Sequence, residues 1–547
     1  MSLFVRLFSW QRLLLAGLLL LGLGLRLLDL TEPPIDYHPT RQLRAAIIAR
    51  GMYYQSLPAA DPQLRDTAVE IWATLESYEP PILERLVAIT YRAMGGENLW
   101  VARVYSSLFW VIGGVALYAL VRRMFAPAGS GGSGVAGGGS SSAALFALAF
   151  YLVLPWGVVA TRTFQPDPWM VMWILIAAYA LYRWAESQAR SWPWTLLAGL
   201  FSGLAILIKA YAVFPVAGMV FGLLAGDLLQ AARGSFLTRL WTLARRPQIW
   251  MLAALAVAIP AVYYLGLGER SSSFASFWIF SFTDLLLDRK FYIQWLGLIR
   301  GLMDVMIFFA ALLGMFLFPS RGRALLAGLW AGYFLIGATF PYQISTHDYY
   351  SLVLVPIVAI SLAVFADWMW ARLRQQPFFW KVAFMAVFVG IAGYYAWVAR
   401  SQVVVTNNQA EPAAWQRMGN ELPRDGAIIA ITHDYGNRLK YYGWRGVNKL
   451  WPTLADQQLT ATANAGSLVS QADFAQFFQQ ETTGMDFFLV TLFADLEAQP
   501  DLKNLLYNHY PLVQQGDGYV LFDLRHPLSS ERPLSPERPL SPERPLP

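Results

Sequence analysis

Long apolar segments recur along this chain and constrain its fold more than any other feature. A helix that crosses the hydrocarbon core of a bilayer needs about 20 consecutive apolar residues. We predict about eleven such helices, at 12–30, 99–121, 143–161, 167–184, 194–209, 211–229, 249–267, 300–318, 323–340, 350–370 and 379–399. The 547 residues are 56% hydrophobic and 14% charged, whereas soluble domains carry about 25% charged residues. The sequence therefore predicts an α-helical polytopic membrane protein.

The first apolar segment has two interpretations. Arg6 and Arg12 precede Leu13–Leu25, a pattern that resembles a secretory signal. No small-x-small cleavage site follows, however, and Arg26 and Asp29 close the segment instead. We therefore favour a retained first span.

The composition also excludes several kinds of chemistry. The chain contains no cysteine, so it has no disulfide framework, thiolate metal site or cysteine nucleophile. The net charge of +6 is spread over many short loops. Membrane topology explains this charge better than nucleic-acid binding does, and we expect no nucleic-acid partner.

Lysine and arginine are concentrated in alternate loops, and this bias orients the chain. A cytoplasmic N-terminus places most of them in the cytoplasm, for example Arg122, Arg123, Arg245 and Arg246. The loop 31–98 and the segment after Arg400 are then external.

Three regions outside the predicted spans differ in composition. Residues 401–526 are polar and contain three strand-like runs, at 427–432, 486–491 and 519–524, which predict a small extracytoplasmic α/β domain. Residues 527–547 repeat a proline-rich motif and predict a disordered tail. The Gly/Ser run 129–142 predicts a flexible linker within a transmembrane domain that covers 1–400, including the loop 31–98.

The strongest candidate for chemistry opens the first external loop. Pro33 and Pro34 force an extended exit from the first span, so Asp36 lies at the membrane surface. Charged groups near membrane depth are costly and are functional candidates for that reason. Tyr37, His38 and Arg41 lie beside Asp36. Alternatively, Asp36 only caps a helix that begins near Pro39.

Other charged and aromatic clusters fall on the same predicted face of the membrane. They contain Glu79, Arg162, Asp167, Lys209, His347, Asp348, Tyr349 and Tyr350. Each cluster alone is compatible with a solvated turn, and the tyrosines are compatible with an interfacial aromatic belt. Polar groups placed by chance would occupy both faces, however, so together they indicate a site. His433 and Asp434 follow a predicted strand and are read as surface turn residues, with a role in acceptor recognition left open.

The order of these elements resembles the membrane-embedded GT-C glycosyltransferases, above all the branch of bacterial aminoarabinose transferases and protein O-mannosyltransferases. The likeness covers about residues 10–400. It rests on Pro-Pro-x-Asp at 33–36, x-Pro-Pro at 79–81, and the segments 98–103, 162–167, 203–209 and 347–350. Two departures stand out: Glu79 occupies a position where many members have His, and Tyr37 follows Asp36 where many have Glu.

This resemblance implies a GT-C fold and an inverting transfer of a sugar from a polyprenyl-phosphate donor on the external face. Asp36 would act as general base toward an acceptor hydroxyl. Arg41, Lys209, Arg162 and His347 would bind the donor phosphate, and Tyr37, His38, Glu79, Asp167, Asp348, Tyr349 and Tyr350 would contact substrates. We expect no required cofactor, although Glu79 could be one ligand of a divalent metal. The acceptor is a lipid, a glycan or a protein.

A second interpretation is a polytopic transporter or flippase of lipid or glycan. It predicts internal repeats with broken helices and polar groups at the bilayer midplane. No repeat stands out, and the charged clusters lie near one surface. A non-catalytic scaffold is a third interpretation, but it leaves the coincidence of acids, histidine and cations unexplained. We expect a multi-pass protein of a bacterial plasma membrane, in contact with membrane lipids.

Overall fold

The computed structural model describes residues 10–75, 79–126, 138–187, 191–230, 235–267, 277–463 and 474–528. The predicted proline-rich tail, apart from its first two residues, and the linker residues 129–137 lie outside these ranges. The chain folds into two compact units. Unit 1 consists of residues 1–30, 77–82 and 100–405, and unit 2 of residues 31–76, 83–99 and 406–547.

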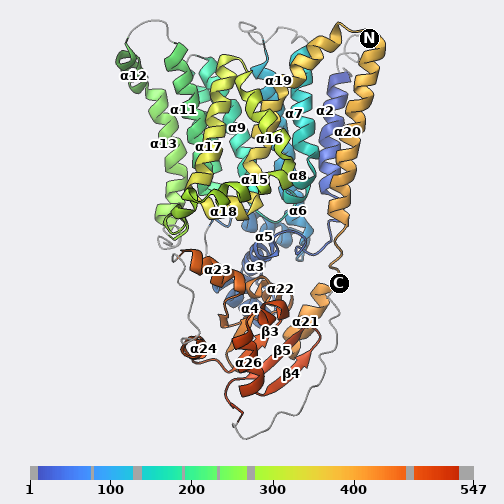
Figure 1. Ribbon diagram of the computed structural model, residues 1–547, viewed down its shortest axis with the longest axis vertical. Helices are drawn as coiled ribbons and strands as arrows, with labels where there is room; N and C mark the ends of the chain where they lie inside the picture. Colours follow the sequence, from blue (N-terminus) through green and yellow to red (C-terminus); the bar gives the residue numbers. More distant parts are fainter. Residues whose placement is uncertain are drawn as a thin grey trace. The chain divides into compact units, whose positions relative to one another are not determined.

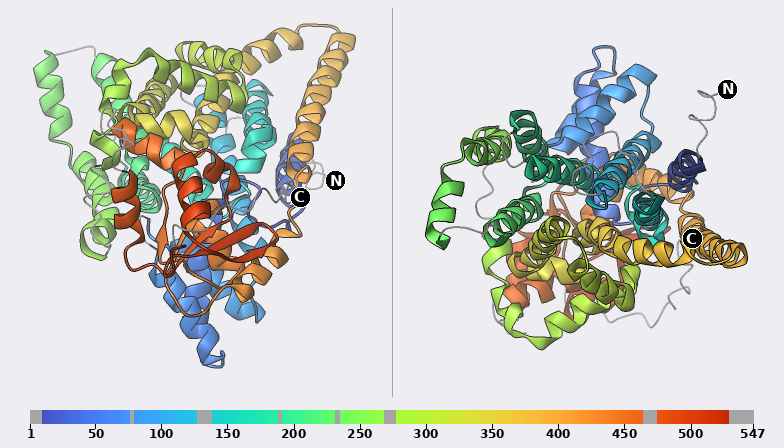
Figure 2. Two further views of the ribbon diagram at one scale, coloured as in Figure 1. Left: turned by 60° about the horizontal axis from the view of Figure 1, so that its bottom comes forward. Right: turned by 90° about the horizontal axis from the view of Figure 1, so that it is seen from above.

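Unit 1 is built from helices, which Figure 1 labels and the right view of Figure 2 shows nearly end-on. The longer ones are α2 (Trp10–Arg26), α6 (Trp100–Met124), α7 (Gly138–Val153), α9 (Asp167–Glu186), α10 (Trp192–Ile208), α11 (Val213–Gln230), α13 (Pro247–Ala261), α15 (Arg289–Met303), α16 (Val305–Phe316), α17 (Ser320–Thr339), α19 (Leu354–Arg374) and α20 (Phe378–Val404). Short helices connect them: α8 (Pro155–Ala160), η1 (Ala210–Ala212), α12 (Phe236–Ala244), η2 (Val262–Leu267), η3 (Thr283–Leu287), α18 (Pro341–Thr346) and η4 (Asp348–Val353).

Apolar helices of membrane-spanning length confirm that this is a multi-pass membrane protein. Within the described residues, five helices are long and apolar enough to cross a bilayer, or six if one bent pair counts as a span. The prediction of about eleven spans is not confirmed. Several predicted spans correspond to helices of fewer than 18 residues, such as α2 and α10 with 17 residues each.

Two of the predicted spans are interrupted. The segment 143–161 is divided at Leu154, and Pro155 begins the separate helix α8. The segment 300–318 bends by 94° between α15 and α16. Asp304 occupies this bend with a φ of 72°, and its side chain accepts the N–H of Met306 at 2.8 Å, which caps α16. The predicted linker was also too long, because α7 already begins at Gly138.

Glycines bring α11 and α17 into close backbone contact. A Cβ on Gly218 would collide with the carbonyl of Gly328, and a Cβ on Gly328 would collide with the carbonyl of Gly218. Gly222 and Gly332 face the partner helix in the same way. Inside a lipid phase, helices have no hydrophobic driving force for association. Small residues at a crossing let the two backbones approach closely, so that van der Waals packing stabilises the pair.

Unit 2 contains a five-stranded mixed sheet. Its strands are β1 (Ile428–Ile431), β2 (Lys449–Leu450), β3 (Phe487–Val490), β4 (Leu512–Gly516) and β5 (Tyr519–Asp523), in the spatial order β2-β1-β3-β5-β4. β1 is parallel to β2 and β3, whereas β5 is antiparallel to β3 and β4. The three predicted strand-like runs contain β1, β3 and β5, so the small α/β domain is confirmed.

Both faces of this sheet are covered, which explains why its central strands are apolar throughout. On one face, Ile429, Phe488 and Phe522 pack with residues of the C-terminal helices. On the other face, Ile428 and Leu489 pack with residues of the helices before and after β1. The helices are α21 (Glu411–Glu421), α22 (Asn437–Tyr442), α23 (Leu454–Ala463), α24 (Phe474–Thr482), α25 (Phe493–Glu497) and α26 (Pro500–His509).

Helices of the first loop also belong to unit 2. They are α3 (Pro39–Gln55), α4 (Pro62–Ala73) and most of α5 (Ile82–Met94). Gly51 of α3 lies against the ring of Trp72 of α4, and no larger side chain fits there. Apart from residues 77–82, the first loop thus groups with the C-terminal residues, whereas the sequence-based domain 1–400 included the whole loop with the membrane helices.

Candidate functional site

A buried lysine organises the most polar cluster of unit 1. Lys209 follows the last residue of α10 in an extended conformation. Its Nζ lies 2.8 Å from Oδ1 of Asp167 and 3.4 Å from Oε1 of Glu79. The Lys209 and Asp167 side chains are 3% and 2% exposed, and Glu79 is 24% exposed. The structure therefore brings together three residues that the sequence predicts as site residues; we call them, with their aromatic neighbours, the Lys209 cluster.

Tyrosine rings complete the Lys209 cluster. The ring centres of Tyr211, Tyr349 and Tyr350 lie 5.1–5.5 Å from Nζ of Lys209. The hydroxyl of Tyr211 donates to Oδ1 of Asp167 at 3.0 Å, and its ring stacks on Tyr350. A buried ammonium needs such compensation, which the carboxylates and the aromatic faces provide. The sequence places Tyr211 in the same predicted cluster as Lys209, two residues later, but gave no reason to assign it a role.

The cluster has unused bonding capacity. It contains two carboxylates for one ammonium, and Oδ2 of Asp167 is buried with no hydrogen-bond partner among the described residues. Nε2 of Gln165, which is buried two residues earlier, likewise has no partner among them. Buried polar atoms normally have a partner, and an exception calls for an explanation. One acceptor and one donor in this turn are thus available to a polar ligand.

Arg162, His347 and Asp348, the other predicted polar residues of unit 1, bond to partners outside the Lys209 cluster. Arg162 is buried and donates to the carbonyl of Asp29 at 2.6 Å. Oδ2 of Asp348 accepts from the indole N–H of Trp156 at 2.9 Å, a partner that the sequence did not suggest. His347 bonds Thr346, and its ring lies edge-on to Tyr349 with 5.5 Å between ring centres. His347 and Asp348 therefore flank the Lys209 cluster through the tyrosines that follow them.

The predicted residues at the start of the first loop, between Asp36 and Arg41, lie in unit 2. Nε2 of Gln42, a buried residue of α3, donates to Oδ1 of Asp36 at 3.1 Å and to the carbonyl of Tyr37 at 2.6 Å. The rings of Tyr37 and His38 meet edge to face at 4.5 Å. Arg41 lies in the first turn of α3.

The alternative that Asp36 only caps a helix is wrong. His38 occupies the N-cap position of α3, with a left-handed φ of 44° and no capping bond from its side chain. Asp36 is instead held by a side chain that reaches back from the helix. No group of three or more His, Asp or Glu side chains in the described part of the chain is arranged to hold a metal ion.

Comparisons with known proteins agree with this architecture. A family profile of dolichyl-phosphate-mannose-protein mannosyltransferases matches residues 78–264. No curated protein matches the sequence significantly. The structure of ArnT from Cupriavidus metallidurans bound to undecaprenyl phosphate matches with 17% identity and a TM-score of 0.53, over 94% of this chain and 98% of that chain.

A second solved structure is the archaeal oligosaccharyltransferase AglB from Archaeoglobus fulgidus, in complex with an inhibitory peptide and a dolichol-phosphate. It matches with 14% identity and a TM-score of 0.56, over 96% of this chain and 76% of that chain. At these identities the two matches establish a shared fold. They confirm the fold that the resemblance of the sequence motifs implies.

Proposed function

We propose that this protein is a GT-C glycosyltransferase that moves a sugar from a polyprenyl-phosphate donor to an acceptor hydroxyl on the external face of the membrane. The observation that carries the proposal is the fold match over nearly the whole chain to ArnT, a protein solved with undecaprenyl phosphate. The mannosyltransferase profile over residues 78–264 supports the same reaction class. The N-terminus is then cytoplasmic and the C-terminal domain extracytoplasmic.

In this proposal Asp36 is the general base. Its carboxylate takes the proton of the acceptor hydroxyl while the acceptor oxygen bonds to the anomeric carbon and the bond from that carbon to the phosphate oxygen breaks. The phosphate leaves as a stable anion and needs no general acid, so one carboxylate is sufficient, unlike the pair that glycosidases use. Attack from the face opposite the phosphate inverts the anomeric carbon. The step uses no metal or other cofactor.

Lys209 is the proposed main ligand of the donor phosphate. Asp167 is its closer and more buried partner, whereas Glu79 is farther away and more exposed. An incoming phosphate therefore takes the place of Glu79 as the second partner of Lys209. Positioned positive charge stabilises the negative charge that develops on the leaving oxygen. Arg41, Arg162 and His347 are proposed to supply further donors to this phosphate.

The sugar and the acceptor are proposed to bind at the polar and aromatic residues around this point. Oδ2 of Asp167 is an available acceptor for a sugar hydroxyl. The rings of Tyr349 and Tyr350 suit packing on a sugar or an isoprenoid chain. Tyr37, His38, Glu79 and Asp348 complete the proposed substrate contacts.

The test is sugar transfer by the purified full-length protein, measured with labelled polyprenyl-phosphate sugars and hydroxyl-bearing lipid, glycan and peptide acceptors. We expect the wild type to release polyprenyl phosphate and label an acceptor, and Asp36→Asn to abolish transfer. Asp66→Asn is the matched control, because this carboxylate of the same loop is 73% exposed. Full activity of Asp36→Asn would remove the base assignment. Translocation of the lipid across vesicles without any transfer would favour the flippase.

A further inference from the structure

The carboxyl ends of β1 and β3 form an edge where α/β sheets commonly bind ligands. β1 is parallel to a neighbour on each side, β2 and β3. The chain leaves β1 toward β2 and returns on the other side as β3, so the connections diverge at the end of β1. Open α/β sheets bind their ligands in the crevice at such a switch point. Here the residues that directly follow the two strands lie at this end of the sheet.

Those residues form a tight polar turn. Oγ1 of Thr491, after β3, donates to Thr432 at 2.9 Å and also contacts the backbone N–H and the Nδ1 of His433. Asp434 and Tyr435 then adopt left-handed conformations, with φ of 52° and 57°. Two consecutive non-glycine residues rarely adopt this conformation, and such positions are concentrated at functional sites. The turn fixes the direction in which the Asp434 carboxylate points.

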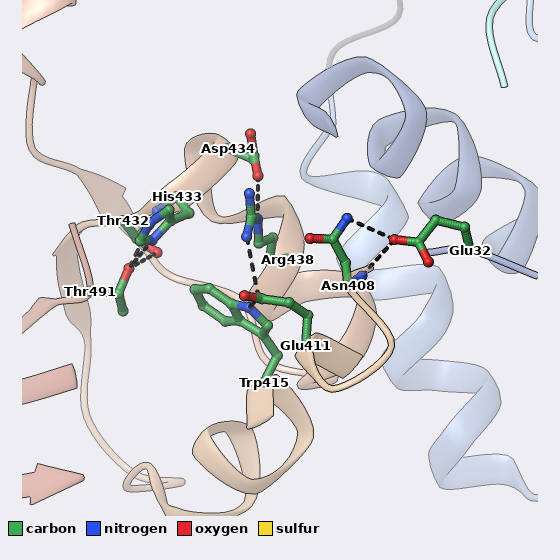
Figure 3. A network of polar contacts seen from close by, with 9 residues as sticks. All are labelled: Glu32, Asn408, Glu411, Trp415, Thr432, His433, Asp434, Arg438 and Thr491. Carbon is green, nitrogen blue, oxygen red and sulfur yellow. Dashed lines mark hydrogen bonds and ion pairs between the residues drawn. The ribbon is translucent and has the colours of Figure 1, made fainter. Parts of the chain in front are cut away.

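The Asp434 carboxylate is held from one side by the domain itself. Nε of Arg438 donates to Oδ2 of Asp434 at 2.5 Å, and another nitrogen of the guanidinium lies 3.2 Å from Glu411. The indole of Trp415 donates to the same Glu411 at 2.7 Å. Figure 3 shows Arg438 between the two carboxylates, with the indole of Trp415 beside Glu411. This leaves Oδ1 of Asp434 to face a different partner.

That partner is the first turn of α3. Oγ1 of Thr40 donates to Oδ1 of Asp434 at 3.2 Å, and Nδ2 of Asn437 donates to the carbonyl of Thr40 at 3.2 Å. The edge that would otherwise take a ligand is thus bonded to a segment of the same chain. A carboxylate beside the first turn also complements the positive end of a helix, and His38 supplies no capping bond of its own.

A second bond connects this helix turn to Asp36. Gln42, two residues after Thr40, donates to the Asp36 carboxylate and to the next carbonyl. The left-handed His38 lies between Asp36 and the helix, so the loop turns sharply and depends on the helix for its position. A third contact of the same kind follows the first span, where Glu32 accepts from the backbone and the side chain of Asn408 (Figure 3). The loop that carries Asp36 is therefore anchored on the C-terminal domain at both ends.

We propose that Asp434 is a positioning residue for the transfer reaction: through Thr40 and the first turn of α3, it sets the orientation of the Asp36 carboxylate. This inference rests on the proposed function, in which Asp36 is the base. A base must lie within hydrogen-bond distance of the proton that it removes, so a displaced helix turn lowers the rate of the chemical step. Donor binding through Lys209 does not depend on it.

The experiment compares Thr40→Val, Asp434→Ala and the double variant in the full-length protein. We expect each single variant to lower kcat at least about tenfold with an unchanged KM for the donor, since a small misplacement can cost about a hundredfold. The double variant should be no slower than Asp434→Ala alone, because both substitutions remove the same bond between Thr40 and Asp434 and only Asp434→Ala also removes the bond to Arg438. Thr40→Ser keeps the hydroxyl and should retain the kcat of the wild type. In each variant, the pH at which kcat/KM falls on the acidic side should equal that of the wild type.

Asp486→Asn is the matched control. This carboxylate accepts the N–H of Ala427 at 2.7 Å, at the amino ends of the same strands. It should lower the melting temperature without changing kcat. A kcat equal to wild type in Thr40→Val and Asp434→Ala, with Asp36→Asn inactive, would overturn this inference alone. If Asp486→Asn lowered kcat as much as Asp434→Ala does, the effect of Asp434 would be a general loss of domain stability and not a positioning role.

Hydrogen exchange supplies a readout that does not depend on activity. Amides of residues 36–45 should exchange faster in Asp434→Ala than in the wild type or in Asp486→Asn. If the wild type transferred no sugar, the proposed function would fail, and this measurement would still decide whether Asp434 orders the helix turn. Unchanged exchange in Asp434→Ala would refute that role.

Discussion

Arg50 in unit 2 and Lys209 in unit 1 are both buried cations beside acidic and aromatic side chains, and their two clusters differ in how completely they are bonded. In unit 2, Nε of Arg50 lies 3.1 and 2.9 Å from the two oxygens of Glu97. Another nitrogen donates to the carbonyl of Tyr441, whose hydroxyl donates to Glu97 at 3.1 Å. The guanidinium lies between the rings of Tyr441 and Trp444, at 3.7 and 4.2 Å from their centres.

The Lys209 cluster of unit 1 also combines a cation with carboxylates and aromatic rings, but its carboxylates outnumber its cation. Lys209 faces two carboxylates, and one oxygen of Asp167 is buried without a partner among the described residues. Arg50, by contrast, has one carboxylate, and both oxygens of that carboxylate are used. A fully bonded buried network fixes a structure, whereas an incompletely bonded one has capacity for a ligand. The comparison supports a structural role for Arg50 and agrees with the proposed role of Lys209 in binding the donor.

The largest expected effect is on the folding of unit 2. Arg50→Ala leaves Glu97, whose side chain is only 16% exposed, without its cation, and breaking a largely buried pair in this way costs up to about 3–5 kcal/mol. Urea unfolding of unit 2, monitored through the hydrogen exchange of its core strands, measures the loss of unfolding free energy. Arg65→Ala is the control, because its ion pair with Asp66 is exposed and should change stability by less than about 0.5 kcal/mol. Equal stability of the two variants would contradict the structural role of Arg50.

A second pair of substitutions tests binding at Lys209. Lys209→Gln should lower kcat/KM for the donor about 10²–10³-fold, the usual cost of losing one group that stabilises transition-state charge. Glu79→Gln should act in the opposite direction and lower the donor KM about fivefold at most, because a partly exposed ion pair contributes about 1 kcal/mol or less.

Glu186→Gln is the control for these two variants, since Glu186 pairs with Arg123 at the other end of α9. Its kinetics of transfer should equal those of the wild type. An unchanged KM in Lys209→Gln together with a raised KM in Glu79→Gln would show that Glu79, and not the phosphate, is the functional partner of Lys209.

The sequence predicted the fold where a local pattern carries the information. β1, β3 and β5 are continuous apolar runs because both faces of the sheet are buried. β2 has two residues and β4 has the sequence LVQQG, so neither shows a strand pattern. The number of spans was not predictable from hydropathy, because a hydropathy window does not detect the bend at Asp304 or the break at Pro155.

The candidate site was predictable to a similar extent. Charged residues in apolar surroundings identified Glu79, Asp167 and Lys209, and the structure brings these three together. The partner of Arg162 is a backbone carbonyl, which no side-chain pattern reveals. The bond between Asp434 and Thr40 joins positions 394 residues apart and depends on a left-handed turn, so sequence reasoning read Asp434 as an ordinary surface residue.

The smallest expected effect is the pH dependence of the stability of unit 2. It distinguishes Arg50 from His433, because their pKa values shift in opposite directions. Burial opposes the charge of Arg50, but Tyr441 and Glu97 outweigh burial and raise its pKa, so Arg50 stays charged throughout the neutral range. Burial, and then the nearby Arg438, lower the pKa of His433 from its ordinary value of 6.5, against the opposing charges of Asp434, Glu411 and Asp495.

Below pH 6.5 the unfolded chain therefore binds a proton at His433 before the folded protein does. The folding stability of unit 2 should be complete above this pH and should decrease as the pH falls toward the lowered pKa of the folded state. Melting temperatures at pH 7.5 and 5.5 measure the difference. His433→Gln should reduce it, whereas His509→Gln, at the end of α26, should keep the wild-type difference. If wild type and His433→Gln lost the same stability between these two pH values, the pH response would arise from other groups, and the charge balance of unit 2 would not depend on a neutral imidazole.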